Sequence, residues 1–157
     1  MRRITVLLAV TLTGAGLATV TTAASSPPLG SATVLIRHQV AHCHAWSVNG
    51  GPFGATQHLS LQRGGTITFM NTDVMPHRLI QLAGARVAMR NGTTMPMGAR
   101  MHGPVAPGAM NHMAATTSIT LARPGVYRFR TRAGEDYMAG IKTTGEDNVL
   151  TLTVTVQ

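Results

Sequence analysis

The chain has a single cysteine, Cys43, and is poor in aromatic and acidic residues. Aromatic residues make up 4% of its 157 residues, and 5 acidic residues stand against 13 basic ones. One cysteine cannot form a disulfide within the chain, so the fold has to be stable without a disulfide scaffold. The scarcity of aromatic side chains and the absence of a Lys/Arg block argue against binding to nucleic acid.

Long apolar runs are missing beyond the N-terminal region. No stretch after residue 24 approaches the roughly 18 apolar residues of a membrane-spanning helix, so we expect no transmembrane segment. The N-terminal residues have the pattern of a secretory signal peptide, because Arg2 and Arg3 precede an apolar run and small residues follow at 21–26. This signal peptide would direct the protein to the periplasm, the cell surface or the medium, and it would be removed by cleavage after Ala23 or Ala24.

The mature chain has the size of one domain. Removal of the predicted signal peptide, residues 1–24, leaves 133 residues, enough for a hydrophobic core. We expect a linker at 25–32 and a single, monomeric domain at 33–157. The mature chain keeps 11 basic and 5 acidic residues, a net charge of +6. A positive charge suits an acidic protein partner or an anionic cell surface.

Strand patterns dominate this domain, and helical periodicity is almost absent. At 66–70 and 151–156, threonines alternate with apolar residues, which gives each strand one exposed and one buried face. Gly64-Gly65 and Pro124-Gly125 supply turns before two of the strands. The sequence therefore predicts an all-β fold, a β-sandwich of seven to eight short strands. The candidate strands are 33–37, 58–62, 66–71, 77–82, 86–89, 117–121, 125–131 and 149–156.

Cys43 lies between His42 and His44. A lone cysteine in an exported protein is a reactive thiol, an intermolecular bridge, a metal ligand or a small buried hydrophobic residue. The flanking imidazoles favour the metal ligand, because thiolate and imidazole together suit zinc or copper. The chain also has ten methionines, whose thioethers bind copper, so copper is the predicted metal.

Three segments resemble the cupredoxins, which are small copper-binding β-sandwiches. Residues 64–77 (GGTITFMNTDVMPH) are similar to the glycine turn, alternating strand and Asn-x-Asp sequence that precede a copper-binding histidine in that family. Residues 121–129 (LARPGVYRF) resemble the family's Pro-Gly-x-Tyr-x-Phe strand, and 149–156 resemble its closing strand. The resemblance implies a cupredoxin-like Greek-key β-sandwich with His77 as a copper ligand. The alternative is a cupredoxin fold that no longer binds a metal, in which His77 only covers the end of the sandwich.

The ligand loop departs from the family pattern. A cupredoxin has a cysteine where this chain has Thr131, and of the ligands that follow it only Met138 is present. We therefore predict a non-standard mononuclear copper site in which the cysteine comes from the first loop. In a regular strand His42 and His44 would share one face and Cys43 the other, so a bend or bulge is needed. The predicted ligands are Cys43, His44, His77 and Met138, with His42 and His38 as reserves.

Residues 91–113 form a Gly/Pro/Met-rich stretch without periodicity, and Met89 precedes it. Its methionines and histidines suit Cu(I), although each methionine can equally be a packing residue. Met110, His112 and Met113 are the members expected nearest the site. Glu135 is a further candidate, as an oxygen ligand.

These features predict an exported copper-binding protein that acts in electron transfer or in copper binding and delivery. Its partner would be a redox or copper-trafficking protein. An enzyme is not expected, because no catalytic triad or paired carboxylates occur at a recognisable spacing. The alternative function is that of a metal-free interaction module with the cupredoxin fold.

Overall fold

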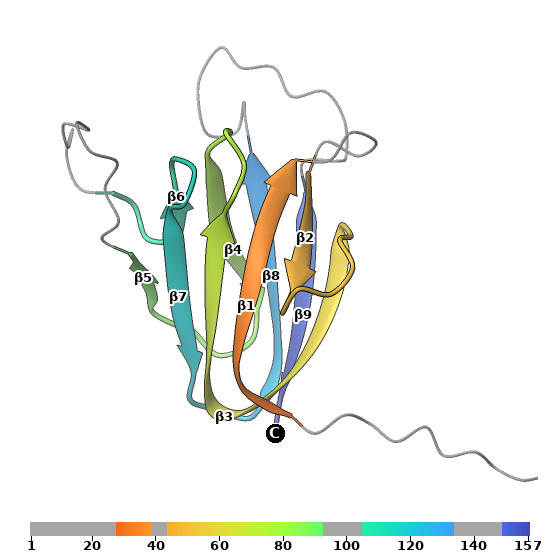
Figure 1. Ribbon diagram of the computed structural model, residues 1–157. Helices are drawn as coiled ribbons and strands as arrows, with labels where there is room; N and C mark the ends of the chain where they lie inside the picture. The colour runs from red at the N-terminus through yellow and green to blue at the C-terminus, as the bar shows by residue number, and fades with distance from the viewer. Residues whose placement is uncertain (1–27, 39–43, 93–104, 134–148) are drawn as a thin grey trace, which may run out of the picture.

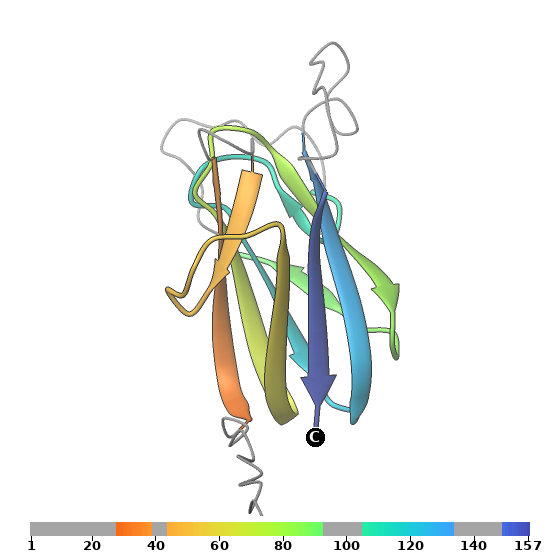
Figure 2. The ribbon, with the colours of Figure 1, turned by 90° about the vertical axis from the view of Figure 1, so that its right-hand side faces the viewer.

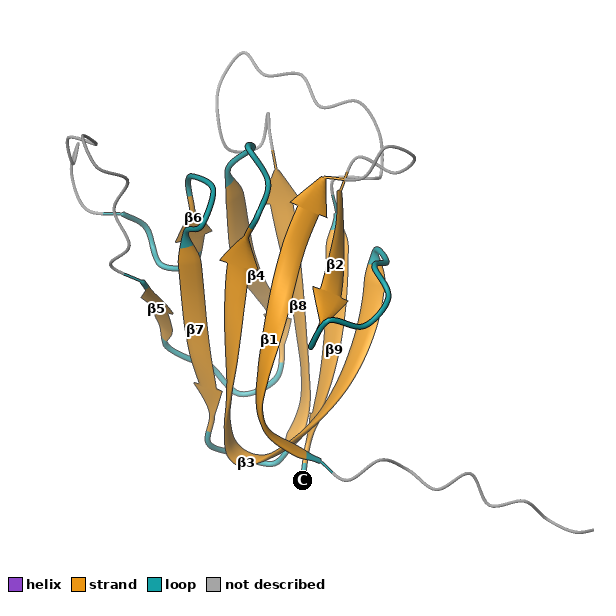
Figure 3. Ribbon diagram, viewed as in Figure 1, coloured by secondary structure: helices purple, strands orange, loops and turns teal. Residues whose placement is uncertain are grey.

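The computed structural model describes residues 28–38, 44–92, 105–133 and 149–157. In these residues the chain forms strands and loops, without a helix (Figure 3). They accordingly contain no helix that is long and apolar enough to cross a membrane. The strands are β1 (Leu29–His38), β2 (His44–Val48), β3 (Thr56–Asn71), β4 (His77–Ala83), β5 (Met89–Asn91), β6 (Ala109–Met110), β7 (Thr116–Leu121), β8 (Gly125–Ala133) and β9 (Leu150–Val156).

The long strand β3 joins two layers of one continuous sheet. Its C-terminal half pairs with β1 in parallel and with β7 antiparallel, which gives the first layer the order β2-β1-β3-β7-β5. Its N-terminal half pairs in parallel with β9, which gives the second layer the order β3-β9-β8-β4-β6. The bend of β3 is visible near the end of the molecule that carries the C-terminus (Figures 1 and 2). The predicted all-β sandwich is confirmed.

Strand boundaries differ from the predictions at several points. The strands predicted at 58–62 and 66–71 are one strand, because Gly64-Gly65 bends β3 into the other layer instead of reversing the chain. Two short strands, β2 and β6, were not predicted. The strand predicted at 86–89 is β5, which begins only at Met89, and β1 begins at Leu29, earlier than expected.

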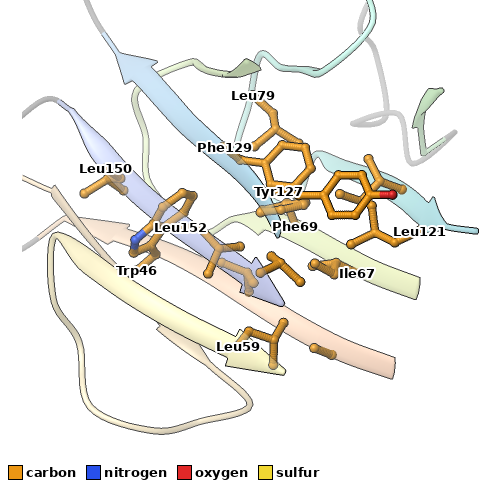
Figure 4. Close-up of a cluster of buried hydrophobic side chains, with 14 of the residues drawn as sticks. Trp46, Leu59, Ile67, Phe69, Leu79, Leu121, Tyr127, Phe129, Leu150 and Leu152 are labelled. Carbon is orange, nitrogen blue, oxygen red and sulfur yellow. The ribbon is translucent and has the colours of Figure 1, made fainter. Parts of the chain in front are cut away.

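The core lies between the two layers, where alternate side chains of the longer strands, such as β7 and β9, point inward (Figure 4). Phe69 of β3 lies near both Trp46 and Phe129, with ring centroids 6.2 and 6.3 Å away. Trp46 is fully buried and belongs to the hydrophobic core. In β9 every second residue is buried, and the threonines between them face outward, as the alternation predicted.

The bend in β3 gives a first testable prediction. A methyl group on Gly65 would meet the side chain of Leu61 and lie 2.8 Å from the backbone oxygen of Gln62. Gly64 has a φ of +80° but open space around it. We expect Gly65→Ala to lower the free energy of unfolding by about 2 kcal/mol through overpacking. Gly64→Ala should lower it by only about 1 kcal/mol, through backbone strain.

Urea titration of both variants measures these two free energies. An equal loss in the two variants would contradict a close approach specific to Gly65.

Candidate metal centre

The candidate site lies at the end of the sandwich opposite the C-terminus. Strands β1 and β8 end there, β2 and β9 begin there, and β3 passes through a short loop into β4 (Figure 1). His44 is the first residue of β2 and His77 the first residue of β4. Asp73 comes from the loop between β3 and β4. The fold thus brings to one place residues that are far apart in the sequence.

His44, Asp73 and His77 form a buried group whose spacing is suited to holding a metal ion. Nε2 of His44 lies 2.8 Å and Nε2 of His77 lies 3.3 Å from the same carboxylate oxygen, Oδ2 of Asp73. The two imidazole rings meet edge to face, with centroids 4.9 Å apart. All three side chains are at most 2% exposed. Asp73 is also the one acidic residue in the described part of the chain.

The contacts of Asp73 with the two histidines differ in kind. The contact with His77 is a hydrogen bond between Nε2 and Oδ2. The contact with His44 is shorter, but its direction lies outside hydrogen-bond geometry, so it is an electrostatic contact. The other oxygen of Asp73, Oδ1, accepts a hydrogen bond from the backbone N–H of Met75 at 3.2 Å. Both carboxylate oxygens are therefore occupied.

These contacts keep Asp73 ionised. Burial raises the pKa of this carboxyl, because it disfavours the charged form. The hydrogen bond with His77 and the backbone N–H of Met75 lower the pKa, as does electrostatic attraction to the two imidazoles. The lowering effects outweigh burial, so the pKa lies below its ordinary value. The group therefore contains a buried negative charge, which favours a cation.

Asn71, the last residue of β3, fixes the loop that carries Asp73. Its side-chain Nδ2 donates to the carbonyl oxygens of Met75 at 2.8 Å and Met110 at 3.1 Å, and lies 3.4 Å from that of His112. Its Oδ1 accepts from the backbone N–H of Asp73 at 2.9 Å. One buried amide thus ties together the β3–β4 loop and the β6–β7 connection.

The next residue ties the same loop to β1. Thr72 donates both its backbone N–H and its hydroxyl to the carbonyl oxygen of Ile36, at 2.8 and 2.6 Å. The loop is therefore held from two sides, which limits how far Asp73 can move relative to the histidines.

The chemistry of this group fits copper. Imidazole nitrogen binds copper, zinc, iron and nickel, so copper is among the metals that the two histidines suit. Nδ1 of His77 is buried and has no hydrogen-bond partner in the described residues. A buried polar atom without a hydrogen-bond partner requires an explanation, and a bound ion is one.

The structure brings together two of the four predicted ligands, His44 and His77. Cys43 and Met138 lie outside the described residues, as do the lower-ranked candidates His42 and Glu135. Strand β1 ends at His38, whose side chain is likewise outside the description.

The Met/His stretch divides into different environments. Met110 is fully buried in the core and pairs in register with His77, so its side chain is a packing residue next to the site. His112 is half-buried, and its Nδ1 lies 2.8 Å from the carbonyl oxygen of Met113. Met113 is 54% exposed. His112 does not belong to the group formed by His44, Asp73 and His77.

Thr131, at the position where cupredoxins have the ligand cysteine, pairs in register with Leu79 in the adjacent strand β4. It is fully buried, and its hydroxyl has no partner in the described residues. The position is thus part of the interior in this chain, and it carries no soft ligand.

Asp73 is the residue of the group that was not predicted. In the sequence it stood out only as part of the Asn-x-Asp pattern that precedes His77. Its position four residues before a predicted ligand, as the one acidic residue outside 134–148, was an available signal.

Comparisons with known proteins gave similarities in structure alone. No protein-family model matches the chain, and no curated protein matches it. A purple cupredoxin from Nitrosopumilus maritimus aligns with 80% of this chain and 99% of its own, at 17% identity and a TM-score of 0.43. An amicyanin mutant aligns with 87% of this chain and 97% of its own, at 15% identity and a TM-score of 0.41.

Proteins of other kinds align equally well. An inclusion body protein from Burkholderia cenocepacia covers 83% of this chain and 98% of its own, at 8% identity and a TM-score of 0.43. Cupredoxins are thus prominent among the solved structures to which the chain is similar, but proteins that are not described as cupredoxins are similar to it as well.

Proposed function

We propose that this protein is an exported copper-binding protein with a non-standard mononuclear site, and that it acts in electron transfer. The ligands would be the imidazoles of His44 and His77, the thiolate of Cys43 and the thioether of Met138. The last two residues remain sequence-based predictions. Copper bound there would supply one-electron chemistry by cycling between its two oxidation states.

The observation that carries this proposal is the meeting of His44 and His77. They were expected to be ligands for different reasons, the first because it adjoins the lone cysteine, the second because of the cupredoxin-like sequence at 64–77. His44 begins β2 and His77 begins β4, and their ring centroids lie 4.9 Å apart. Burying two histidines next to an ionised carboxylate costs free energy unless the group binds a cation or its members form hydrogen bonds with one another.

Electron transfer is favoured by how firmly these residues are held. The hydrogen bonds of Asn71 and Thr72 restrain the loop, and both histidines begin regular strands inside the sandwich. A donor set that does not move when the metal changes its oxidation state keeps the reorganisation energy low. Export and the positive net charge fit an acidic redox partner outside the cytoplasm.

Copper delivery is the second candidate, and Met113 favours it. Its thioether is 54% exposed beside the half-buried His112, so soft donors are accessible near the site. The two functions differ in how tightly the metal is held. A delivery site should lose copper to a modest chelator within minutes, whereas an electron-transfer site should keep it.

A metal and spectral analysis tests the proposal. Protein recovered from the compartment to which it is exported should contain one equivalent of copper and show a thiolate charge-transfer band in the visible spectrum. Cys43→Ser should lose this band, because the hydroxyl is a poor soft ligand. In the wild type, copper should protect Cys43 from alkylation, since the same sulfur lone pair serves as nucleophile and ligand.

Recombinant protein refolded with and without copper provides the control for the alkylation rate. Absence of bound copper under all loading conditions, together with a stable fold, would favour a metal-free interaction module instead.

A further inference from the structure

We propose that the outer face of the second layer is a docking surface for an acidic segment of a partner protein, which binds to Arg78, Arg128 and Arg130. Arg78 lies on β4, and the other two arginines lie on β8, the strand paired with it. None of them belongs to the group that forms the candidate metal centre. The inference therefore goes beyond the proposed function and applies to the metal-free protein as well.

The strands place these three arginines on one face. Arg128 and Arg130 alternate on β8 with buried residues, and Arg78 lies between two buried residues of β4. Since alternate side chains of a strand point to opposite faces, all three point away from the core. Ile80 on β4 is directly opposite Arg130 and so shares its face. On the other side of β8 lies β9, whose outward positions are threonines (Figure 2).

In the described part of the chain, no negative charge balances these arginines. The one acidic residue there, Asp73, is buried, and the ion pairs there join it to histidines and to no arginine. Nε of Arg130 is buried without a hydrogen-bond partner in the same residues. Arg132 stands directly opposite Arg78 in the register, and like charges at opposite positions destabilise a sheet. The positive charges thus repel one another in the free protein and favour an anionic partner.

The outer face of the first layer has a different composition. Its outward positions on β3 and β7 include Thr66, Thr68 and Thr120, which carry no charge. Arg37 on β1 and Arg90 on β5 also point outward there, but β3 and β7 lie between their strands. The cluster on β4 and β8 is therefore a property of one face and does not follow from the net charge alone.

Arginine together with apolar neighbours favours a protein as the partner. A guanidinium group can bind a carboxylate through two parallel hydrogen bonds. Val126, which is 51% exposed, lies two residues before Arg128 and shares its face, and the half-buried Ile80 lies opposite Arg130. Protein interfaces are enriched in arginine around an apolar centre. A surface that only attracts an anionic membrane or polysaccharide does not need such apolar side chains.

An NMR titration of the metal-free protein, labelled with nitrogen-15, tests the location of this surface. The probe is a short peptide of glutamate and leucine, and its control has glutamine in place of glutamate. We expect the largest chemical-shift changes with the acidic peptide at the Nε–H groups of Arg78, Arg128 and Arg130, and none with the neutral peptide. Equal changes at Arg37 and Arg90 would overturn the inference, because net charge alone would then attract the peptide.

Two double variants measure the contribution of the face. Arg128→Gln combined with Arg130→Gln should weaken binding of the acidic peptide about tenfold, since both arginines lose a charge-assisted contact. Arg37→Gln combined with Arg90→Gln removes the same charge from the other outer face. It should weaken binding by less than about twofold at physiological ionic strength, because salt screens distant charges. Equal losses in the two folded variants would overturn the inference, and the wild-type titration decides the location if either variant does not fold.

Other occupants of the face give different outcomes in the same assays. Tighter binding of phosphatidylglycerol vesicles or heparin than of the acidic peptide would identify a membrane or a polysaccharide and overturn the protein partner. The acidic residues of 134–148 are Glu135, Asp136, Glu146 and Asp147. Peptide binding only after these four are changed to their amides would show that the chain itself occupies the face, and no binding in either protein would also overturn the inference. Copper enters none of these measurements, so a failure of the proposed function leaves their outcome unchanged.

Discussion

Replacing His77 with alanine is expected to weaken copper binding by about 3 kcal/mol, or roughly 100-fold in the dissociation constant. Structural metal sites with four ligands contribute about 10–16 kcal/mol, so one ligand accounts for roughly a quarter of that. His77 is fully buried at the start of β4, where water cannot readily take its place. Competition with a chelator of known copper affinity measures the effect.

His58→Ala is the matched control, because it removes an exposed histidine from β3 outside the candidate group. Its copper affinity should equal that of the wild type. Circular dichroism has to show that His77→Ala is folded, since the substitution also removes a partner of the buried Asp73. Unchanged copper stoichiometry and affinity in folded His77→Ala would remove this residue from the site.

Asn71→Ala is expected to cost about 3 kcal/mol of unfolding free energy and to lower the melting temperature by roughly 10 °C. The substitution leaves the carbonyl oxygens of Met75 and Met110 and the backbone N–H of Asp73 without their partner inside the protein. Each buried polar group left unsatisfied costs about 1–3 kcal/mol, although relaxation of the loop recovers part of it. Copper affinity should fall as well, since the loop that carries Asp73 is released.

Gln81→Ala separates these two effects. Like Asn71, Gln81 makes four hydrogen bonds through its side-chain amide. It donates to the carbonyl oxygens of Ala83, Gly84 and Ala85 and accepts from the backbone N–H of Val87. It lies toward the end of β4, away from His77 at its start. We expect Gln81→Ala to lose stability but to keep its copper affinity. Equal loss of copper affinity in both variants would show that Asn71 acts only through global stability.

Much of the fold follows from local patterns. Alternation of apolar residues with threonine identified β9 and the second half of β3, because side chains on a strand point to opposite faces. The short strands β2 and β6 escaped prediction. Strand β6 has only two residues, which is too short for a periodic signal, and four of the five residues of β2 are buried, so no alternation marks it.

The sequence also pointed to the two histidines of the candidate site, one from its cysteine neighbour and one from a motif. It said nothing about Asp73 as their shared partner. Such a contact depends on the distance between side chains from separate connections, and no local propensity encodes that distance.

By itself the sequence determined the class of fold and the kinds of donor atom available, because strand periodicity and side-chain chemistry are local properties. Only the tertiary structure decided which donors meet. The pairing of β1 with β2 and the loop held by Asn71 and Thr72 place His44 beside Asp73 and His77. The contacts of Asp73 with His77, Met75 and His44 then keep its carboxylate charged although burial disfavours the charged form. Nδ1 of His77 is buried there without a partner in the described residues.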